Sequence, residues 1–312
     1  MQQVAAHNTL DSLGTTPWHL KLDVQLFGPK DVLTEQGTIE EWWSDADNWR
    51  ITYTEPSFTG TSLQIEGKFY RTTSPGVEAS IYDDILDQVV HPLSNEGDVT
   101  LAKPDLRQQI FGKTALDCIM LVQPLVKVAF PPLGLFPTFC LDPGNDVLRI
   151  SVDSGSLIFA RSRVGDFLGR SVPVDLLAQS GQQAIAKAHL IALSTMKADV
   201  MALVSTPEME QHASPEVRVS GSVIAGSIIS KVPPIYPERA KQNHVSGSVV
   251  LRAIIGRDGR VRSLQVMSTE DSDLAVAALQ SVRQWIYTPF LLNGLPTEVD
   301  TTVTVNFSMG PG

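Results

Sequence analysis

The sequence predicts an α+β protein: a mainly antiparallel β meander with one or two helices, followed by a small two-layer α/β domain. Across the first two thirds of the 312 residues, short runs of alternating apolar and polar residues are separated by turn-forming clusters. In the last third, a hairpin signal, an amphipathic helix and another alternating run follow one another. Residues 205–216 are rich in Pro, Ser, Glu and Gln, which is typical of a linker. We therefore expect a β-rich domain at residues 1–204 and a second domain at residues 217–312.

The first strand is predicted at residues 18–27, where every second residue from Trp18 to Leu26 is apolar and the residues between them are polar. This period of two is typical of a strand with one buried face. Glu40 and Glu41 occupy adjacent positions on the next predicted strand. Their carboxylates are therefore expected on opposite faces and cannot act together on one substrate atom.

The other elements of the front region follow from apolar and β-branched runs on either side of turn clusters. An apolar stripe from Ile81 to Val90 predicts an amphipathic helix at residues 78–90, which His91-Pro92 would end. Asp83 and Asp84 are expected on its solvated face. Further strands are predicted at residues 37–43, 49–54, 64–72 with a bend at 66–67, 147–152, 157–161, 172–178 and 184–193. The alanines of the last run would also suit a helix.

The last third is predicted to contain a short helix, a hairpin, a longer helix and a final strand. Pro237 can open the short helix, because its missing N–H is not needed in a first turn. Asp258-Gly259 supplies the tight turn of the hairpin, and Asp271 or Ser272 can cap the longer helix. The four elements are expected at residues 237–243, 247–267, 273–285 and 299–307. Together they would form a small sandwich with an exposed sheet edge.

Composition places the chain among folded soluble proteins, with 43% hydrophobic and 19% charged residues. No apolar run reaches the ~20 residues that a membrane-spanning helix needs. Residues 1–225 hold 16 Lys and Arg against 27 Asp and Glu, whereas residues 226–312 hold 8 against 7. We expect no nucleic-acid partner, because phosphate contacts require clustered basic side chains. The segment Met1–Val4 lacks the basic and apolar regions of a secretory signal, so it is either a cytosolic start or a mature chain whose leader was removed.

No group of residues in the sequence predicts catalysis. Dinucleotide-binding, phosphate-loop, zinc-protease and serine-hydrolase motifs are absent, and the six histidines are scattered without metal-ligand spacing. We therefore predict no enzyme, no catalytic residues, no metal and no cofactor. The two cysteines, Cys118 and Cys140, can form one disulfide or remain two buried thiols.

Residues 226–309 resemble the C-terminal domain of TonB-family energy transducers over nearly its whole length. Several matching positions also have a physical reason: Gly259 accepts a positive φ in the hairpin turn, and Trp285 gives the helix a large buried anchor. The matching residues are Tyr236, Pro237, Ala240, Gly247, Val249, Asp258, Gly259, Val261, Ser268, Leu274, Ala277, Val282, Trp285, Tyr287, Pro289, Gly294, Pro296, Val303 and Phe307.

In that family, the last strand offers its free edge to a short extended segment of an outer-membrane transporter, which adds a strand through backbone hydrogen bonds. The alternative is that residues 299–307 form an internal strand or pair across a homodimer. The resemblance implies partner binding by Tyr236, Pro237, Val299, Thr301, Thr302, Val303, Thr304, Val305, Asn306 and Phe307.

The resemblance implies a periplasmic protein, membrane-associated in its full-length precursor, that docks on TonB-dependent receptors and supports energy-dependent transmembrane transport. An inner-membrane motor complex would be a further partner if an anchor was removed. The chain departs from the family pattern, since it shows neither an N-terminal membrane helix nor a long Pro-rich spacer, and its 20 prolines are scattered. Either the anchor was removed together with the leader, or the docking module has been reused without one.

The strand pattern of residues 15–200 resembles the half-barrel of periplasmic lipoprotein carriers such as LolA. This resemblance implies an apolar concave face that can take a lipid, and Trp42, Trp43 and Trp49 can form an aromatic platform for such a ligand. The alternative is a filled β core without a cavity. A second function is therefore a periplasmic lipid or lipoprotein carrier, with the TonB-like domain as a docking or dimerisation module.

Overall fold

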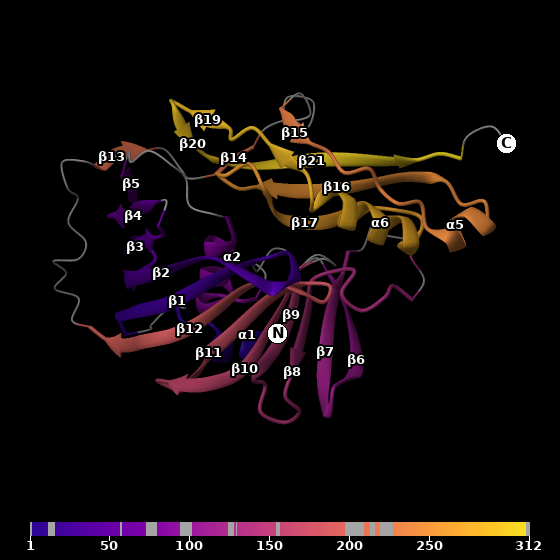
Figure 1. The fold of residues 1–312 in the computed structure, drawn as a ribbon. Helices are drawn as coiled ribbons and strands as arrows, with labels where there is room; N and C mark the ends of the chain where they lie inside the picture. Colours follow the sequence, from indigo (N-terminus) through magenta and orange to yellow (C-terminus); the bar gives the residue numbers. More distant parts are fainter. Residues whose placement is uncertain are drawn as a thin grey trace. The chain divides into compact units, whose positions relative to one another are not determined.

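The computed structural model describes residues 2–11, 16–56, 58–72, 80–93, 102–123, 128, 130–153, 157–196, 209–212, 216–218 and 227–309. Most of these residues are in β-strands, with few helices (Figure 1). The chain divides into two compact units. Unit 1 comprises Met1–Leu93, Phe159–Pro215 and Asn293–Leu295, and unit 2 comprises Ser94–Ile158, Glu216–Leu292 and Pro296–Gly312. The domains predicted from the sequence, residues 1–204 and 217–312, remain a prediction.

Unit 1 consists of antiparallel strands accompanied by short helices. Its helices are α1 (Gln2–Asn8), the 3₁₀ turn η1 (Pro29–Asp31) and α2 (Ser80–Val90). Its strands are β1 (Trp18–Gly28), β2 (Val32–Asp45), β3 (Asn48–Thr54), β4 (Thr59–Ile65), β5 (Lys68–Thr72), β10 (Leu157–Phe167), β11 (Arg170–Ser180), β12 (Gln183–Thr195) and β13 (Met209–His212). They are hydrogen-bonded in the order β13-β5-β4-β3-β2-β1-β12-β11-β10.

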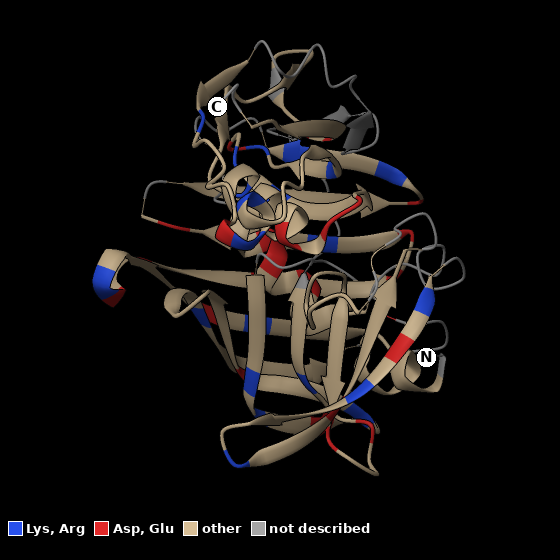
Figure 2. Cartoon of the chain, turned by 90° about the vertical axis from the view of Figure 1, so that its right-hand side faces the viewer, with Lys and Arg blue, Asp and Glu red and all other residues tan. Residues whose placement is uncertain are grey.

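Strand β1 has the two faces that its sequence predicts. Trp18, Leu20 and Val24 on one face are 0% exposed, and the ring of Trp18 stacks on a neighbouring tryptophan of β2. On the other face the chain is polar, and Glu40 of β2 accepts hydrogen bonds from that side of β1. Glu41 is buried at 5% exposure, so the two adjacent carboxylates do lie on opposite faces. Charged residues of both signs are interspersed along the described strands (Figure 2).

Helix α2 is confirmed over its described part, since its apolar residues from Tyr82 to Val90 are buried in the core of unit 1. The prediction that Asp83 faces solvent is wrong. Asp83 is 9% exposed and accepts a 2.7 Å hydrogen bond from the hydroxyl of Tyr53 on β3. This bond fixes the helix against the sheet and satisfies a carboxylate that would otherwise be costly to bury.

Most predicted strand limits of the front region agree with the structure to within about two residues, although β2 begins earlier and β10 ends later than predicted, and the predicted bend at residues 66–67 is confirmed. Residues 64–72 form parts of two strands, because Glu66 and Gly67 both have positive φ, 49° and 72°, and reverse the chain between β4 and β5. The ambiguous alanine-rich run is strand β12, not a helix. Part of the predicted linker, Met209–His212, pairs with Phe69–Thr72 as strand β13, and the rest of it, apart from Glu216, lies outside the described residues.

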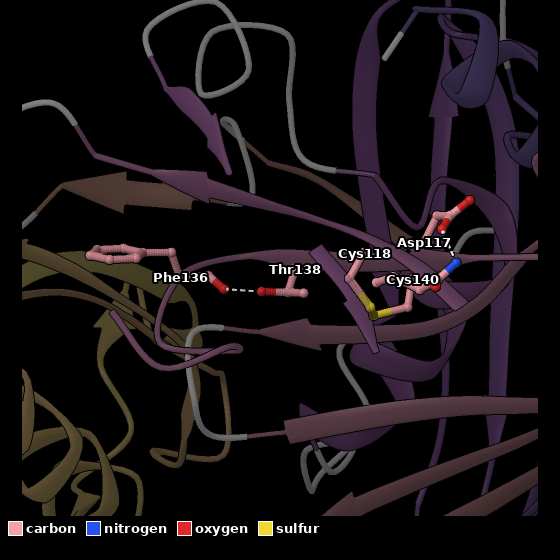
Figure 3. The surroundings of a disulfide bond; sticks show 6 residues. Asp117, Cys118, Phe136, Thr138 and Cys140 are labelled. Carbon is pink, nitrogen blue, oxygen red and sulfur yellow. Dashed lines mark hydrogen bonds between the residues drawn. A yellow bond between two sulfur atoms is a disulfide. The ribbon is translucent and has the colours of Figure 1, made fainter. Parts of the chain in front are cut away.

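The first part of unit 2 contains four antiparallel strands and a disulfide. The strands, β6 (Lys103–Phe111), β7 (Thr114–Val122), β8 (Thr138–Leu141) and β9 (Leu148–Asp153), follow the order β9-β8-β7-β6. Cys118 and Cys140 face each other in the β7–β8 register and are joined by a disulfide, with an S–S distance of 2.06 Å (Figure 3). The loop that leads into β8 carries Leu135 and Phe136, which are 2% and 0% exposed. Thr138 closes this loop by donating a 2.8 Å hydrogen bond to the carbonyl of Phe136.

The C-terminal part of unit 2 has the order of elements that its sequence predicts. The strands and helices are β14 (Glu216–Arg218), β15 (Ile228–Ser230), α5 (Glu238–Gln242), β16 (Gly247–Ile255), β17 (Val261–Ser268), α6 (Ser272–Val282), β18 (Ile286–Tyr287), β19 (Leu291–Leu292), β20 (Leu295–Pro296) and β21 (Glu298–Phe307). The main sheet has the order β14-β21-β16-β17, in which β16 and β21 are long antiparallel neighbours (Figure 1).

Helix α6 begins where predicted and ends a turn earlier. The side chain of Asp271 accepts hydrogen bonds from the backbone N–H groups of Asp273 and Leu274, both at 2.9 Å, so Asp271 is the N-cap. The expected end at Trp285 is wrong, because the helix stops at Val282 and the next residues turn toward β18. Trp285 still serves as the buried anchor, at 4% exposure.

One hydrophobic core joins the C-terminal fold to the loop before β8. Helix α6 is buried around most of its circumference, because seven of its residues between Leu274 and Val282 are buried. Three residues from the front part of unit 2, Met120, Leu135 and Phe136, belong to the same core cluster as the inner faces of α6, β16, β17 and β21. The C-terminal fold therefore packs against this loop, which contributes side chains to its hydrophobic core.

Candidate partner-docking edge

Strand β21 presents alternating side chains to two different surroundings. Val303, Val305 and Phe307 point into the core at 4–7% exposure, together with Val299 at 0% and Thr301 at 4%. The intervening Thr302, Thr304 and Asn306 are exposed. Of the residues predicted to bind a partner, half are thus committed to the core, and their side chains cannot contact a partner while the fold is intact.

The backbone of β21 is paired fully on one side and only partly on the other. Strand β16 pairs with it from Gly247↔Phe307 to Ile255↔Val299. On its second side, β14 runs parallel to it and pairs only with Glu298–Asp300. Within the described part of the chain, no strand pairs with Thr301–Phe307 on that side. This stretch is the candidate site, because an extended peptide can hydrogen-bond to such an edge.

The predicted site residue Tyr236 lies beside the end of β21 and anchors it. Its hydroxyl donates a 2.5 Å hydrogen bond to the carbonyl of Val245, and its ring meets Phe307 edge-on. Pro237 is the N-cap position of α5, with extended backbone angles. Tyr236 and Pro237 therefore have structural roles in the C-terminal fold, and a direct role in partner binding remains a prediction.

A second set of contacts holds the segment before Tyr236 against α6. The carbonyl of Val232 accepts hydrogen bonds from the indole N–H of Trp285, at 2.8 Å, and from the hydroxyl of Ser281, at 2.7 Å. The ammonium group of Lys231 lies 4.7 Å from the Trp285 ring centroid, a cation–π distance. The segment that leads into the C-terminal fold is therefore fixed in place by polar contacts.

Two ion pairs stiffen the first half of β21 on its outer face. Arg252 of β16 makes a two-pronged contact with Asp300, at 3.0 and 3.1 Å, and Arg262 of β17 reaches Glu298 at 2.9 Å. Both carboxylates are mostly buried, so these pairs are screened less by salt than surface pairs. Each carboxylate at the start of β21 is thus paired with an arginine beside the candidate edge.

The three front tryptophans do not share one surface. Trp43 is 6% exposed and stacks on Trp18, with centroids 5.7 Å apart. Trp42 lies on the opposite face, where it stacks on His19 at 4.9 Å. Trp49 pairs with Trp43 in the strand register and tilts against a phenylalanine of β5. A ligand role for these residues, and with it a lipid site, stays a prediction.

In the described residues, no three His, Cys, Asp or Glu side chains are grouped so that they could hold a metal ion. No described helix combines the length and the apolar character needed to cross a membrane. Burial raises the pKa of Tyr287 beneath the C-terminal sheet to about 12, so its hydroxyl stays neutral at physiological pH.

The C-terminal fold is similar to a known protein family. Residues 232–309 match the family model of the Gram-negative bacterial TonB protein C-terminal, which confirms the resemblance read from the sequence. Over 83 residues the chain is 24% identical to Protein TonB of Vibrio cholerae, a match that covers 26% of this chain and 34% of that protein. The chain thus spans about a third of the length of this curated relative. Neither match is to a catalytic family.

Two solved structures are similar to larger parts of the chain. A LolA superfamily protein from Nitrosomonas europaea has a TM-score of 0.43 and 9% identity, and the alignment covers 65% of this chain and 97% of that one. A DUF1329 family protein from Desulfovibrio piger has a TM-score of 0.27 and 10% identity, with 64% and 92% covered.

Two features of unit 2 that bear on the C-terminal fold were missed by sequence reasoning. The first is strand β14, whose three residues fall partly in the predicted linker and are too few to show a period of two. The second is the pair Leu135 and Phe136 in a Pro- and Gly-rich loop. A signal for the second existed, because apolar residues of this size in a loop are costly to expose and often mark a contact.

Proposed function

We propose that the C-terminal fold docks on a short extended segment of an outer-membrane TonB-dependent transporter, which adds as a strand along Thr301–Phe307 of β21. In this proposal the protein works in the periplasm and supports energy-dependent transmembrane transport. An inner-membrane motor complex is a further proposed partner, and no enzymatic activity is part of the proposal. The match of residues 232–309 to the TonB C-terminal family supports this function.

The observation that carries the proposal is the half-paired state of β21. The inward-pointing side chains of β21 are buried, and the first of its two edges is paired with β16. Along Thr301–Phe307, its second edge has no partner strand among the described residues. Backbone N–H and C=O groups along such an edge are the part of the strand that a peptide can recognise, with Thr302, Thr304 and Asn306 beside it for selectivity.

Strand addition along this edge should give modest affinity. Each backbone hydrogen bond contributes roughly 0.5–1.5 kcal/mol net, and association and ordering of the peptide consume part of that gain. We therefore expect a dissociation constant on the order of 1–100 μM for an isolated peptide. A longer partner with contacts beyond the strand would bind more tightly.

The test is an NMR titration of the full chain with synthetic peptides that copy the N-terminal segments of the source organism's TonB-dependent transporters. Binding should shift the backbone amide resonances of Thr301–Phe307. Strand β17 (Val261–Ser268), the other end strand of the same sheet, is the internal control and should shift little. Unchanged resonances along β21 at saturating peptide, or shifts confined to β17, would contradict the proposal. A scrambled peptide reports non-specific binding.

A further inference from the structure

The first residues of β21, directly before the proposed docking stretch Thr301–Phe307, are already paired with another strand of the chain. Strand β14 runs parallel to β21, with Glu216 opposite Glu298, Val217 opposite Val299 and Arg218 opposite Asp300. It lies at the end of the sheet order, on the side of β21 away from β16. Its place is therefore the place that an added strand would take if it paired along the whole length of β21.

We infer that β14 is an autoinhibitory strand, which competes with the partner segment for the first residues of β21 and must leave before the partner can pair along the full strand. This inference rests on the proposed function, since it concerns regulation of the same edge. The two occupants exclude each other because a backbone N–H or C=O that faces β14 cannot bond to a second strand at the same position.

The length of β14 makes it suited to displacement. Its described residues number three, and three residues of a parallel pair form few hydrogen bonds. In the described part of the chain no strand pairs with the neighbouring stretch Thr301–Phe307 on this side, so a partner can start pairing there while β14 is still bound. The partner can then extend toward Glu298 as β14 detaches, so the edge never has to be bare along its whole length.

The expected effect on affinity follows from the population of the open edge. If β14 is bound most of the time, the apparent affinity for a full-length partner strand is reduced by the fraction of molecules in which β14 is detached. A short strand held by few bonds should be detached in roughly 10–30% of molecules. Removing it should therefore tighten partner binding by about three- to tenfold.

Two adjacent proline substitutions test this inference in the full chain. Successive residues of a strand direct their N–H groups to opposite sides, so of Val217 and Arg218 only one donates toward β21. Val217→Pro and Arg218→Pro therefore form a matched pair, in which one removes a bond to β21 and the other removes an outward-facing N–H that an edge strand can lose. Val217→Ala and Arg218→Ala correct for the lost side chains.

Two readouts are measured for each variant. Hydrogen exchange without peptide reports whether the amides of Glu298–Asp300 that face β14 become unprotected. Titration with the synthetic transporter peptides reports affinity. We expect one proline variant to raise exchange at these amides and to bind the peptide about three- to tenfold more tightly, while the other behaves like its alanine control.

The other outcomes separate the inference from the proposed function. If exchange rises and peptide affinity along Thr301–Phe307 stays at the wild-type value, β14 is only structural and the inference is wrong, while docking stands. If neither proline variant changes exchange or affinity, the inference is also wrong. If no variant binds any transporter peptide, including the one whose edge has opened, the proposed docking function fails and the inference fails with it.

Discussion

The ring of Tyr236 meets the ring of Phe307 edge-on, with centroids 5.5 Å apart and planes at 89°. The contact ties the segment before α5 to the end of β21. Phe307 is 4% exposed, and the Tyr236 hydroxyl is used in a hydrogen bond to the carbonyl of Val245. Both residues were predicted to bind a partner, and both hold the docking strand in position. A partner strand would therefore meet the backbone of β21 and its outward-facing side chains.

Replacing Tyr236 should separate its two contacts. Tyr236→Phe keeps the ring against Phe307 and removes the hydrogen bond to Val245, so the free energy of unfolding should fall by about 1 kcal/mol. Tyr236→Ala also removes the ring contact and should cost about 3 kcal/mol. Urea unfolding followed by fluorescence measures both values. Equal losses for the two variants would show that the ring contact contributes nothing.

Gly259 and Gly294 form a matched pair for backbone strain, since both have positive φ, 77° and 85°. A Cβ atom at position 259 would lie 2.0 Å from the carbonyl oxygen of Tyr287, whereas at position 294 no atom lies within 4 Å. Gly294→Ala should cost about 1 kcal/mol, because only the left-handed conformation is penalised. Gly259→Ala should cost roughly 3 kcal/mol or more, because backbone must move as well. Similar melting temperatures for the two variants would contradict this reading of the hairpin turn.

The loop before β8 should contribute to the stability of the C-terminal fold. Phe136→Ala removes a side chain that is 0% exposed from the shared core, and should lower the free energy of unfolding by about 3–5 kcal/mol. Phe130 is the control, because it is 94% exposed, and its replacement by Ala should change stability by less than about 0.5 kcal/mol. Trp285, the one tryptophan of unit 2, reports the transition by fluorescence. Equal effects of the two variants would argue against the shared core.

The sequence predicts best where one local pattern determines the structure. The alternation from Trp18 to Val24 placed β1 and its buried face correctly, and Asp271 and Gly259 were sufficient to place a cap and a turn. The predicted helix end was wrong because Trp285 continues the apolar stripe of α6, whereas in the structure its indole N–H donates to the carbonyl of Val232, a contact that the sequence does not indicate.

The sequence pattern did not predict contacts between residues that lie far apart in the chain. Asp83 looked solvated because its partner, Tyr53, lies on a different element, and nothing local marks their hydrogen bond. The partial cover of β21 by Glu216–Arg218 was missed for the same reason, since three residues carry no period. For the candidate site, the sequence therefore indicated the strand and its fold, and the structure added which part of the edge lacks a partner strand among the described residues.

The buried carboxyl of Glu41 should make the stability of unit 1 depend on pH. Burial raises its pKa to about 8; the charge of His91 opposes this rise, and Asp11 and Asp87 reinforce it. Burial alone would lower the pKa of His91, but the carboxylates of Asp87 and Asp11 raise it to about 11, so His91 stays charged while Glu41 titrates. Glu41 is thus neutral in the folded protein at neutral pH and ionised in the unfolded chain.

The sign of the effect follows from proton binding. Between about pH 4.5 and pH 8 the folded state holds a proton on Glu41 that the unfolded state has lost, so stability is full below this window and falls as pH rises through it, by up to about 1.4 kcal/mol per pH unit. Glu41→Gln removes this slope and should be more stabilising at pH 8 than at pH 4. Chemical unfolding of both proteins at these two pH values measures the difference. A difference that is independent of pH would contradict a raised pKa.

The central claim, that a partner strand lies along Thr301–Phe307, is tested most directly by site-specific cross-linking. Both cysteines of the chain are joined in the disulfide, so one introduced thiol is unique. Thr304→Cys places it on the exposed face of β21, and Gln280→Cys places it at an exposed position of the otherwise largely buried α6 as the control. A transporter peptide with one activated cysteine should form a mixed disulfide rapidly with Cys at position 304 and slowly at position 280. Equal rates at the two positions, or faster reaction at position 280, would contradict docking on this edge.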